Sequence, residues 1–427
     1  MPAPSDTARR DPAASAAGES SRRRRARADK TSTNVAMIAA AAVPCGRLQT
    51  PETADVHSLE HEVLAGCVLE AVGAAGVPKE SIGALVFCTP RAYTPQLYFG
   101  TFMANYLRLP TDGVLMEVLG NGMTGGLAFD QAAQAIASGR AEVALALGVN
   151  FETATPAPAH MNRSMRATGD VSFQAPFGFT PISWYAMDAV RYMHEFGATR
   201  AELAAVAVKN RRHAMLNPLA QFRKPVTLEE VLAQRPIVEP LGLYEVPPRS
   251  DGAACIVLAS ERVARELRRP YVKVIGRGFH HEGAHQISEV PNDMIALNAA
   301  QRAGRAAFAE AGIAAADVDL AEVYAPCTIV EVLVSEALGF VPRGRGAKAA
   351  AAGETALGGR IPICTSGGLT SRGHPPYITP LYSFVELFEQ LTQRAGERQV
   401  SEAQLGVATC ELGNYNAALV HVLQANG

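Results

Sequence analysis

The sequence lacks the features that would assign it to several common classes of protein. Its seven cysteines form no Cys-x-x-Cys pair and are odd in number, which argues against a disulfide framework or a zinc site and favours a reducing, cytoplasmic setting. No stretch approaches the roughly 18 apolar residues that a membrane-spanning helix needs. With a net charge of −2 and a charged fraction of 19%, the chain also lacks the basic surplus of a nucleic-acid-binding protein.

The first 33 residues differ in composition from the rest of the chain. They are rich in Ala, Ser and Pro and hold eight Lys and Arg against four Asp and Glu, including the run at 22–25. Such a segment cannot bury enough apolar surface to fold, so residues 1–33 are predicted to form a disordered basic tail. The alanine-rich run at 39–42 is too short for a signal peptide, and we interpret it as part of a first core strand.

The remaining chain has the alternating pattern of an α/β protein. Short apolar runs predict buried strands, and apolar residues three or four positions apart predict helices. In the first half we expect strands at 35–43, 84–88, 143–149 and 253–259, and helices at 59–73 and 127–138. In the second half we expect strands at 271–275 and 321–324 and a helix at 294–311.

The second half repeats the plan of the first. A shift of 236 positions places Gly312 on Gly76 and Tyr324 on Cys88. A shift of 242 positions places Gly367-Gly368-Leu369 on Gly125-Gly126-Leu127. An internal duplication of this kind predicts two similar α/β units whose loops meet at a shared edge.

We therefore expect a first half at 34–265 and a second half at 266–427. A long segment at about 150–234 lies between the matched cores and has helical stretches, including one at 181–196. A segment of this size inserted into a duplicated core is typical of a lid or of a binding site for the tail of a substrate.

The stretch at 364–377 carries the most chemical information. A strand-like run at 361–363 leads to Cys364 and a glycine pair, and His374 follows between Gly373 and two prolines. Glycine lets the backbone approach a ligand closely, and proline holds the chain beyond the imidazole. The motif alone is explained equally well by a catalytic histidine and by a histidine in an ordinary Gly/Pro turn.

Five segments carry a wider resemblance: residues 209–227, 237–241, 250–254, 322–340 and 367–375. Together they resemble the thiolase superfamily, specifically sterol-carrier-protein-type thiolases and lipid-transfer-protein thiolase homologues, over about residues 34–425. The resemblance implies a duplicated thiolase fold with five layers in the order αβαβα. It also implies an acyl-CoA substrate, no permanently bound cofactor besides the CoA of that substrate, a homodimer, and in some homologues a small OB-fold partner subunit.

The catalytic pattern of the family is only partly present. Its Cys-x-Ser-Gly-Gly motif reads Gly122-Met123-Thr124-Gly125-Gly126, so the nucleophilic thiol at a helix N-terminus is missing. Its His-Asp-x-Phe-Thr motif reads Tyr324-Ala325-Pro326-Cys327-Thr328, with tyrosine in place of histidine. The Gly-His-Pro histidine is kept as His374, and Cys410 falls near the position of the last acid/base residue.

This combination is similar to the retro-aldolase branch, which cleaves a carbon–carbon bond β to a thioester carbonyl and needs no acyl-enzyme. In this interpretation His374 and Tyr324 exchange a proton with the β-oxygen, and Cys410 assists or lines the site. Backbone N–H groups around Gly122 and Gly413 would stabilise the thioester enolate.

Two alternatives remain open at this stage. An acyltransferase or condensing enzyme could use another thiol, such as Cys364 or Cys410, since the shift of 242 places Cys364 on Gly122. A chain without catalytic activity could bind acyl groups or support a partner. Tyr377 is a further candidate for a side chain pointing into the site, and no set of residues suggests a metal.

Overall fold

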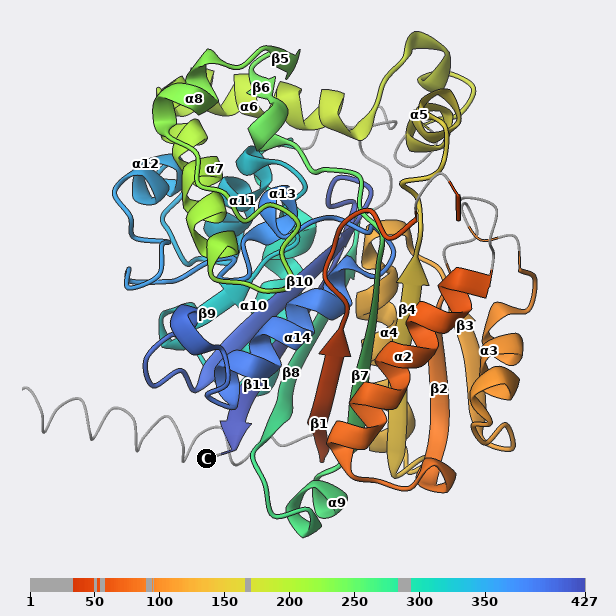
Figure 1. Cartoon of the computed structure of the whole chain (residues 1–427). Coiled ribbons are helices and arrows are strands. Elements are labelled where there is room, and N and C mark those ends of the chain that lie inside the picture. Colours follow the sequence, from red (N-terminus) through yellow and green to blue (C-terminus); the bar gives the residue numbers. More distant parts are fainter. Residues whose placement is uncertain are drawn as a thin grey trace, which may run out of the picture.

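The computed structural model describes residues 34–49, 52–53, 58–89, 94, 96–165, 170–282 and 293–426. The predicted basic tail at 1–33 lies outside the described residues. Figure 1 shows the strands in the centre of the molecule, helices on both sides of them, and a group of helices above one end of the strands.

Nine strands form one mixed sheet in the order β3-β2-β4-β7-β1-β8-β11-β10-β9. Five of them come from the first half: β1 (Val35–Ala42), β2 (Ile82–Cys88), β3 (Val114–Val118), β4 (Val143–Asn150) and β7 (Gly252–Ser260). The second half supplies β8 (Tyr271–His281), β9 (Leu320–Glu322), β10 (Leu405–Leu412) and β11 (Ala417–Asn426). The predicted strands lie within or close to these bounds.

The pairing of the strands confirms the duplication. In the first half β3, β2 and β4 are parallel, and β7 and β1 follow antiparallel. In the second half β9 and β10 are parallel, and β11 and β8 follow antiparallel. The predicted strand at 361–363 is reduced to a parallel bridge between Ile363 and Ala321, in the position that β3 holds in the first half. Among the described strands, β1 and β8 join the two halves of the sheet, through the pairs Ala36–Lys273 and Met37–Val272.

The helices form three layers, and together with the two halves of the sheet they give the expected five layers. The outer layer of the first half holds α2 (Ser58–Ala75) and α3 (Phe99–Leu107), and that of the second half holds α10 (Asn298–Ala311) and α11 (Thr328–Ala337). The middle layer holds α4 (Thr124–Ala137) and α14 (Thr379–Leu391). Three large clusters of buried apolar side chains fill the spaces between these layers. The thiolase-type duplicated fold predicted from the sequence is therefore present.

The middle layer corrects one detail of the predicted repeat. The rings of Phe129 in α4 and Phe384 in α14 stack with centroids 3.8 Å apart, so α14 is the counterpart of α4. The glycine pair at 367–368 instead opens α13 (Gly368–Ser371), a single turn. The shift of 242 predicts that Cys364 lies at the N-terminus of the helix that matches α4. The structure shows that it does not, because that helix is α14.

The inserted segment lies above the carboxyl end of β4 (Figure 1). It contains α5 (Ala157–Met165), α6 (Pro181–Phe196), α7 (Arg200–Met215) and α8 (Leu228–Ala233), followed by the small strands β5 (Pro236–Val238) and β6 (Leu241–Gly242). The buried carboxylate of Asp251 accepts hydrogen bonds from the backbone N–H groups of Glu152 and Thr153, at 2.8 and 2.9 Å. This contact ties the start of the segment to the core.

Two short helices complete the described chain, α9 (Glu261–Glu266) between β7 and β8 and α12 (Gly346–Ala351) after α11. Among the described residues, none of the helices combines the length and the apolar character needed to cross a bilayer.

An ion pair across the middle layer gives a first testable prediction. Asp130 in α4 accepts hydrogen bonds from Arg277 in β8, one of them at 3.0 Å, and its carboxylate lies 3.4 Å from His421 in β11. Burial alone would raise the pKa of Asp130, but its interactions with His421 and Arg277 outweigh burial and lower the pKa from 3.8 to about 2. The stabilisation is therefore present above pH 4 and is lost as the pH falls from 4 to 2.

We expect Asp130→Asn to lower the free energy of unfolding at pH 7 by about 3 kcal/mol, because Arg277 and His421 lose a buried partner. Denaturant unfolding at pH 7 and at pH 3 measures this. The difference between variant and wild type should shrink at pH 3, and an equal difference at both pH values would contradict the account.

Candidate active site

A cavity of about 500 Å³ lies where loops from both halves meet the inserted segment. Tyr324, His374, Tyr377 and Glu411 from the second half line it, together with Gly122 from the first half. Pro181, Ile182 and Tyr185 from α6 and Arg163 from α5 also line it. The structure thus brings together His374, Tyr324, Gly122 and Tyr377, four of the residues that the sequence had singled out.

Gly122 and Tyr324 share one space. A β-carbon added at Gly122 would lie 2.6 Å from the hydroxyl oxygen of Tyr324 and 2.8 Å from its Cζ. Both distances are far below van der Waals contact, so a side chain at position 122 and the phenol cannot coexist in this arrangement. The phenol therefore occupies the place where a thiol on residue 122 would begin.

The backbone of Tyr324 is held by β10 and by the turn that follows it. Tyr415 donates a hydrogen bond from its hydroxyl to the carbonyl of Tyr324, at 2.6 Å. Thr409 in β10 accepts one from the N–H of Tyr324, at 3.0 Å. Because both groups are buried, they fix the point from which the phenol of Tyr324 projects into the cavity.

His374 is oriented by hydrogen bonds on both its ring and its backbone. Its N–H donates to Ser250 Oγ at 2.8 Å, and its Nδ1 lies 3.0 Å from Thr379 Oγ1. The Thr379 hydroxyl donates its single proton to the carbonyl of Pro375, at 2.8 Å, so it accepts from Nδ1–H of the imidazole. This network assigns the lone pair to Nε2.

Gly373 permits this placement of His374. Its φ is +120°, and a β-carbon there would lie 2.5 Å from the Cβ of Cys45. Only glycine satisfies both conditions at once. The glycine of the Gly-His-Pro motif is therefore required for the backbone conformation, in addition to the imidazole that the histidine supplies.

The protonation states of the two rings follow from their burial. Burial, together with the charge of Arg372, lowers the pKa of His374 from 6.5 to about 3, so the imidazole is neutral at pH 7. Burial, together with the charge of Glu411, raises the pKa of Tyr324 well above 10, so its phenol keeps its proton. The two rings meet edge to face, with centroids 5.6 Å apart. The cavity therefore pairs a proton acceptor with a proton donor.

The sequence placed Cys410 in the site, but its neighbour Glu411 lines the cavity. Successive residues of β10 point to opposite faces of the sheet. The thiol of Cys410 faces α4, where a β-carbon on Gly126 would lie 2.1 Å from its sulfur, and donates to the carbonyl of Leu419 at 3.7 Å. The catalytic role predicted for Cys410 thus has no support in its position.

Glu411 is the functional candidate that sequence reasoning missed. Its carboxylate accepts a hydrogen bond from the N–H of Tyr415 at 3.0 Å and another from the side chain of Tyr185. Burial nevertheless raises its pKa from 4.5 to about 7. The rule that successive side chains of a strand point to opposite faces, applied to residues 410 and 411, could have identified it. A carboxyl group with this pKa can give or take a proton near neutral pH.

The other predicted residues lie away from the cavity. Cys364 is fully buried and does not line it, and its thiol donates to the carbonyl of Val323 at 3.5 Å. Burial raises the pKa of the thiols of Cys364 and Cys410 well above 9, so both stay protonated at neutral pH. Gly413 lies in the turn after β10 with φ of +50° and is not among the residues that line the cavity.

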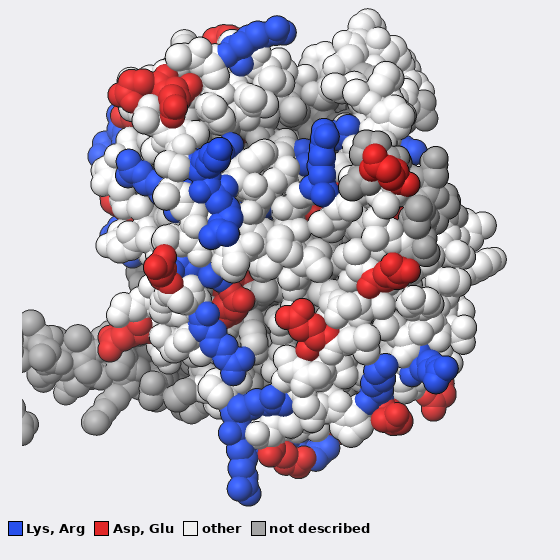
Figure 2. Space-filling model, viewed as in Figure 1, with Lys and Arg blue, Asp and Glu red and all other residues white. Residues whose placement is uncertain are grey.

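Positive charge lies at the edge of the cavity without forming a basic surface. Arg249 lines the cavity and donates to the carbonyl of Thr155 at 2.6 Å, and Arg163 is exposed on α5. Figure 2 shows Lys and Arg interspersed with Asp and Glu over the face that it draws, with large uncharged areas over the inserted segment. This face is therefore mixed in charge.

Comparison with known families identifies the superfamily of this chain. The family model "Thiolase, N-terminal domain" matches residues 35–262, and "Thiolase C-terminal domain-like" matches residues 280–425. The chain belongs to the thiolase superfamily. Acetyl-CoA acetyltransferase of Methanothermobacter thermautotrophicus is 37% identical over 303 residues, which cover 70% of this superfamily member and 77% of that protein.

Sterol carrier protein 2 of Bos taurus is 30% identical over 323 residues. The match covers 71% of this thiolase-superfamily chain and 58% of the bovine protein, so the chain spans less than two thirds of that relative. The match supports assignment to the sterol-carrier-protein type within the superfamily.

Among solved structures, the "Ltp2-ChsH2(DUF35) aldolase" matches with a TM-score of 0.77 and 26% identity, covering 92% of this chain and 98% of that one. Human mitochondrial 3-ketoacyl-CoA thiolase in complex with CoA matches with a TM-score of 0.66 and 14% identity, covering 92% and 98%. The second match shows the shared fold alone.

The shared space of Gly122 and Tyr324 gives a testable prediction. We expect Gly122→Ala to lower the free energy of unfolding by about 1–3 kcal/mol, because the new methyl group meets the phenol. In a Tyr324→Ser background the same change should cost less than about 1 kcal/mol, since the space is then empty. A double-mutant cycle of unfolding free energies measures the difference, and additive effects would contradict the contact.

Proposed function

We propose that this chain cleaves the C2–C3 bond of a 3-hydroxyacyl-CoA thioester, releasing a carbonyl compound and a shorter acyl-CoA. The observation that carries the proposal is the phenol of Tyr324 in the place where a nucleophilic thiol on residue 122 would begin. Without that thiol, the acyl-enzyme route of the superfamily has no nucleophile, whereas a retro-aldol step needs only a base and a donor.

The first step uses the two rings. His374 Nε2 takes the proton of the 3-hydroxyl group, the C3–O bond becomes a carbonyl, and the C2–C3 bond breaks. Its electron pair passes to C2 and onto the thioester oxygen as an enolate. Tyr324, which keeps its proton because burial raises its pKa, donates a hydrogen bond to that oxygen, and backbone N–H groups near Gly122 assist.

The second step restores a proton at C2. Glu411 lines the same cavity, and burial raises its pKa to about 7, so a large fraction of it is a carboxylic acid at neutral pH. We assign to Glu411 the transfer of this proton to C2, which gives the shorter acyl-CoA. The proton held by His374 then returns to Glu411 through solvent, so the cycle needs no other reactant.

The relatives support two reactions, retro-aldol cleavage and, as the second candidate, acyl transfer. The structural relative with 26% identity is named an aldolase, whereas the relative from M. thermautotrophicus is named an acetyltransferase. An acyltransferase would need another thiol, but Cys364 and Cys410 are buried outside the cavity and burial raises their pKa. These positions favour the aldolase.

Two assembly proposals accompany the reaction. Beside the edge strand β3, Tyr106 in α3 and Tyr98 just before it are 51% and 79% exposed, which suits pairing with a second copy. A small OB-fold partner is supported by the aldolase structure, whose name, Ltp2-ChsH2, includes a second component. Light scattering of the purified chain of 45.1 kDa tests the homodimer, which a mass of one chain would contradict.

The experiment that tests the proposed function is a carbonyl-release assay. We expect the wild type to convert 3-hydroxyacyl-CoA substrates to a carbonyl compound and a shorter acyl-CoA. Tyr324→Phe removes only the donor and should lower kcat by about 10²- to 10⁴-fold.

The matched control is Cys410→Ala, which changes a buried neighbour in the adjacent strand without touching the cavity. It should keep kcat within a few-fold of the wild type and lower stability by about 1–2 kcal/mol. Loss of activity in Cys410→Ala together with full activity in Tyr324→Phe would overturn the assignment.

A further inference from the structure

The inserted segment meets Glu411 through one side of α6. Pro181, Ile182 and Tyr185 of this helix line the active-site cavity, and of these three only Tyr185 has a polar side chain. Its side chain is buried, and it donates a hydrogen bond to the carboxylate of Glu411. The inserted segment therefore supplies a hydrogen-bond donor to the group that we assign as the acid for C2.

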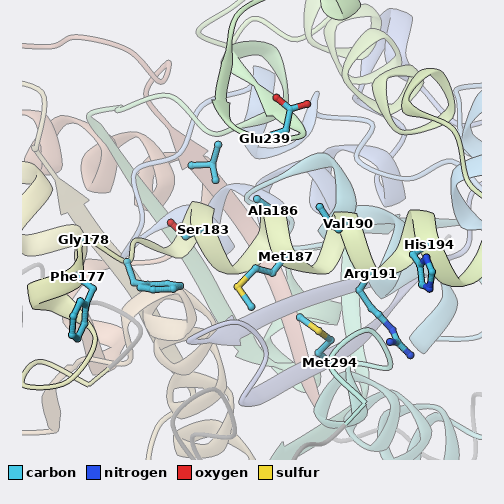
Figure 3. Close-up of a pocket in the computed structure, with 12 residues that line it drawn as sticks. Phe177, Gly178, Ser183, Ala186, Met187, Val190, Arg191, His194, Glu239 and Met294 are labelled. Atoms are coloured by element: carbon cyan, nitrogen blue, oxygen red, sulfur yellow. The ribbon is translucent and has the colours of Figure 1, made fainter.

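The two sides of α6 have different surroundings. Tyr185, Ala189 and Tyr192 are four and three positions apart, so they share the inner side of the helix, where all three are buried in the core. On the outer side, Met187 and Val190 line a separate cavity of about 590 Å³ (Figure 3). The packing of the inner side thus holds Tyr185 against the active site.

Three donors hold the carboxylate of Glu411. Two are the backbone N–H groups of Asn414 and Tyr415 in the turn after β10, the second at 3.0 Å. Asn414 and Tyr415 have φ of +54° and +59°, and turns of this kind can direct successive N–H groups to one anion. The hydroxyl of Tyr185 is the third donor. Among these three it is the one on a side chain, so a substitution can remove it without changing the backbone.

The hydroxyl of Tyr185 favours one protonation state of Glu411. Burial, together with the charge of Glu411, raises the pKa of Tyr185 well above 10, so this hydroxyl keeps its proton. A hydrogen bond to a carboxylate is stronger than one to a neutral carboxylic acid. Burial raises the pKa of Glu411, and the three donors limit this rise to about 7. Loss of one donor therefore keeps Glu411 protonated to a higher pH.

We infer that Tyr185 is a positioning residue, whose hydroxyl holds the carboxyl group of Glu411 at the cavity and favours its ionised form. The inference rests on the proposed function, in which Glu411 gives a proton to C2 and then regains one. An acid that both gives and regains a proton works best when neither form is strongly favoured at the working pH. The inserted segment then takes part in the proton transfer in addition to covering the site.

Other ionisable groups also face Glu411. After burial, the charge of Glu411 helps to raise the pKa of Tyr324, Tyr415 and Cys410. Further ionisable side chains line the same cavity: Glu152, His160, Arg163, Arg249, Cys327, His374 and Tyr377. All of these groups stay the same in variants that lose a single tyrosine hydroxyl on α6. A difference between two such variants therefore reports on the hydroxyl that was removed.

The test compares Tyr185→Phe with the matched control Tyr192→Phe. Both changes remove a hydroxyl from the inner side of α6 and keep the aromatic ring, and therefore the packing. The hydroxyl of Tyr192 also donates to a carboxylate, that of Glu336 at 2.5 Å, but neither residue lines the active-site cavity. We expect Tyr185→Phe to raise the pKa of Glu411 by about one unit, and Tyr192→Phe to leave it unchanged.

The pH dependence of kcat measures this shift. Glu411 gives its proton as the acid, so kcat falls as the pH rises above the pKa of Glu411. A pKa that is one unit higher should raise the ratio of kcat at pH 9 to kcat at pH 7 about fivefold in Tyr185→Phe. The same ratio in Tyr185→Phe and in the wild type, or an equal rise in Tyr192→Phe, overturns the inference.

A titration separates failure of the inference from failure of the proposed function. Protein labelled with 13C at the side-chain carboxyl groups of glutamate is titrated by NMR, and the signal of Glu411 is identified by its absence in Glu411→Gln. A higher pKa of Glu411 in Tyr185→Phe than in Tyr192→Phe supports the inference even if no 3-hydroxyacyl-CoA is cleaved, in which case the proposed reaction alone fails. Equal pKa values in the two variants overturn the inference, and carbonyl release by the wild type then leaves the proposed function intact.

Discussion

The account depends on a steric exclusion between two residues that are 202 positions apart, Gly122 and Tyr324. A side chain on residue 122 would begin inside the phenol of Tyr324. Glycine at 122 and tyrosine at 324 are therefore sterically coupled, because the phenol fills the space that a side chain on residue 122 would need. Tyr415 and Thr409 hold the backbone of Tyr324 in the position from which its phenol fills that space.

Burial sets the chemistry of the remaining groups in the cavity. It lowers the pKa of His374 and raises that of Glu411, so that a neutral base and a partly protonated acid are present together near pH 7. In water a histidine would also be mostly neutral at pH 7, whereas a glutamate would be almost fully ionised, so burial changes the state of Glu411 most. The duplicated fold makes this possible because the loops of both halves meet below the inserted segment, which covers them.

Much of the fold could be predicted from the sequence, because buried strands are short and apolar and the two halves repeat the same order. The predicted strand at 361–363 was wrong in extent, since Pro362 has no N–H and limits the pairing to a single bridge. The predicted helix at 294–311 begins four residues later because Leu297, with φ of +45°, precedes its first turn.

The site was predictable only in part. His374 and Tyr324 were identified by their motifs, but the contact between Tyr324 and Gly122 joins distant segments and needs coordinates. Glu411 was missed because a difference of one residue in a strand reverses the face to which a side chain points. The tautomer of His374 depends on Thr379 and Pro375, whose hydrogen bonds no sequence pattern specifies.

The most direct test of the central claim is intact-protein mass spectrometry during turnover. The protein is incubated with a 3-hydroxyacyl-CoA and sampled while carbonyl product accumulates. The account predicts that the mass of the chain stays unchanged throughout, because the bond is broken without a covalent intermediate. A species heavier by one acyl group, formed and consumed at the rate of turnover, would contradict it.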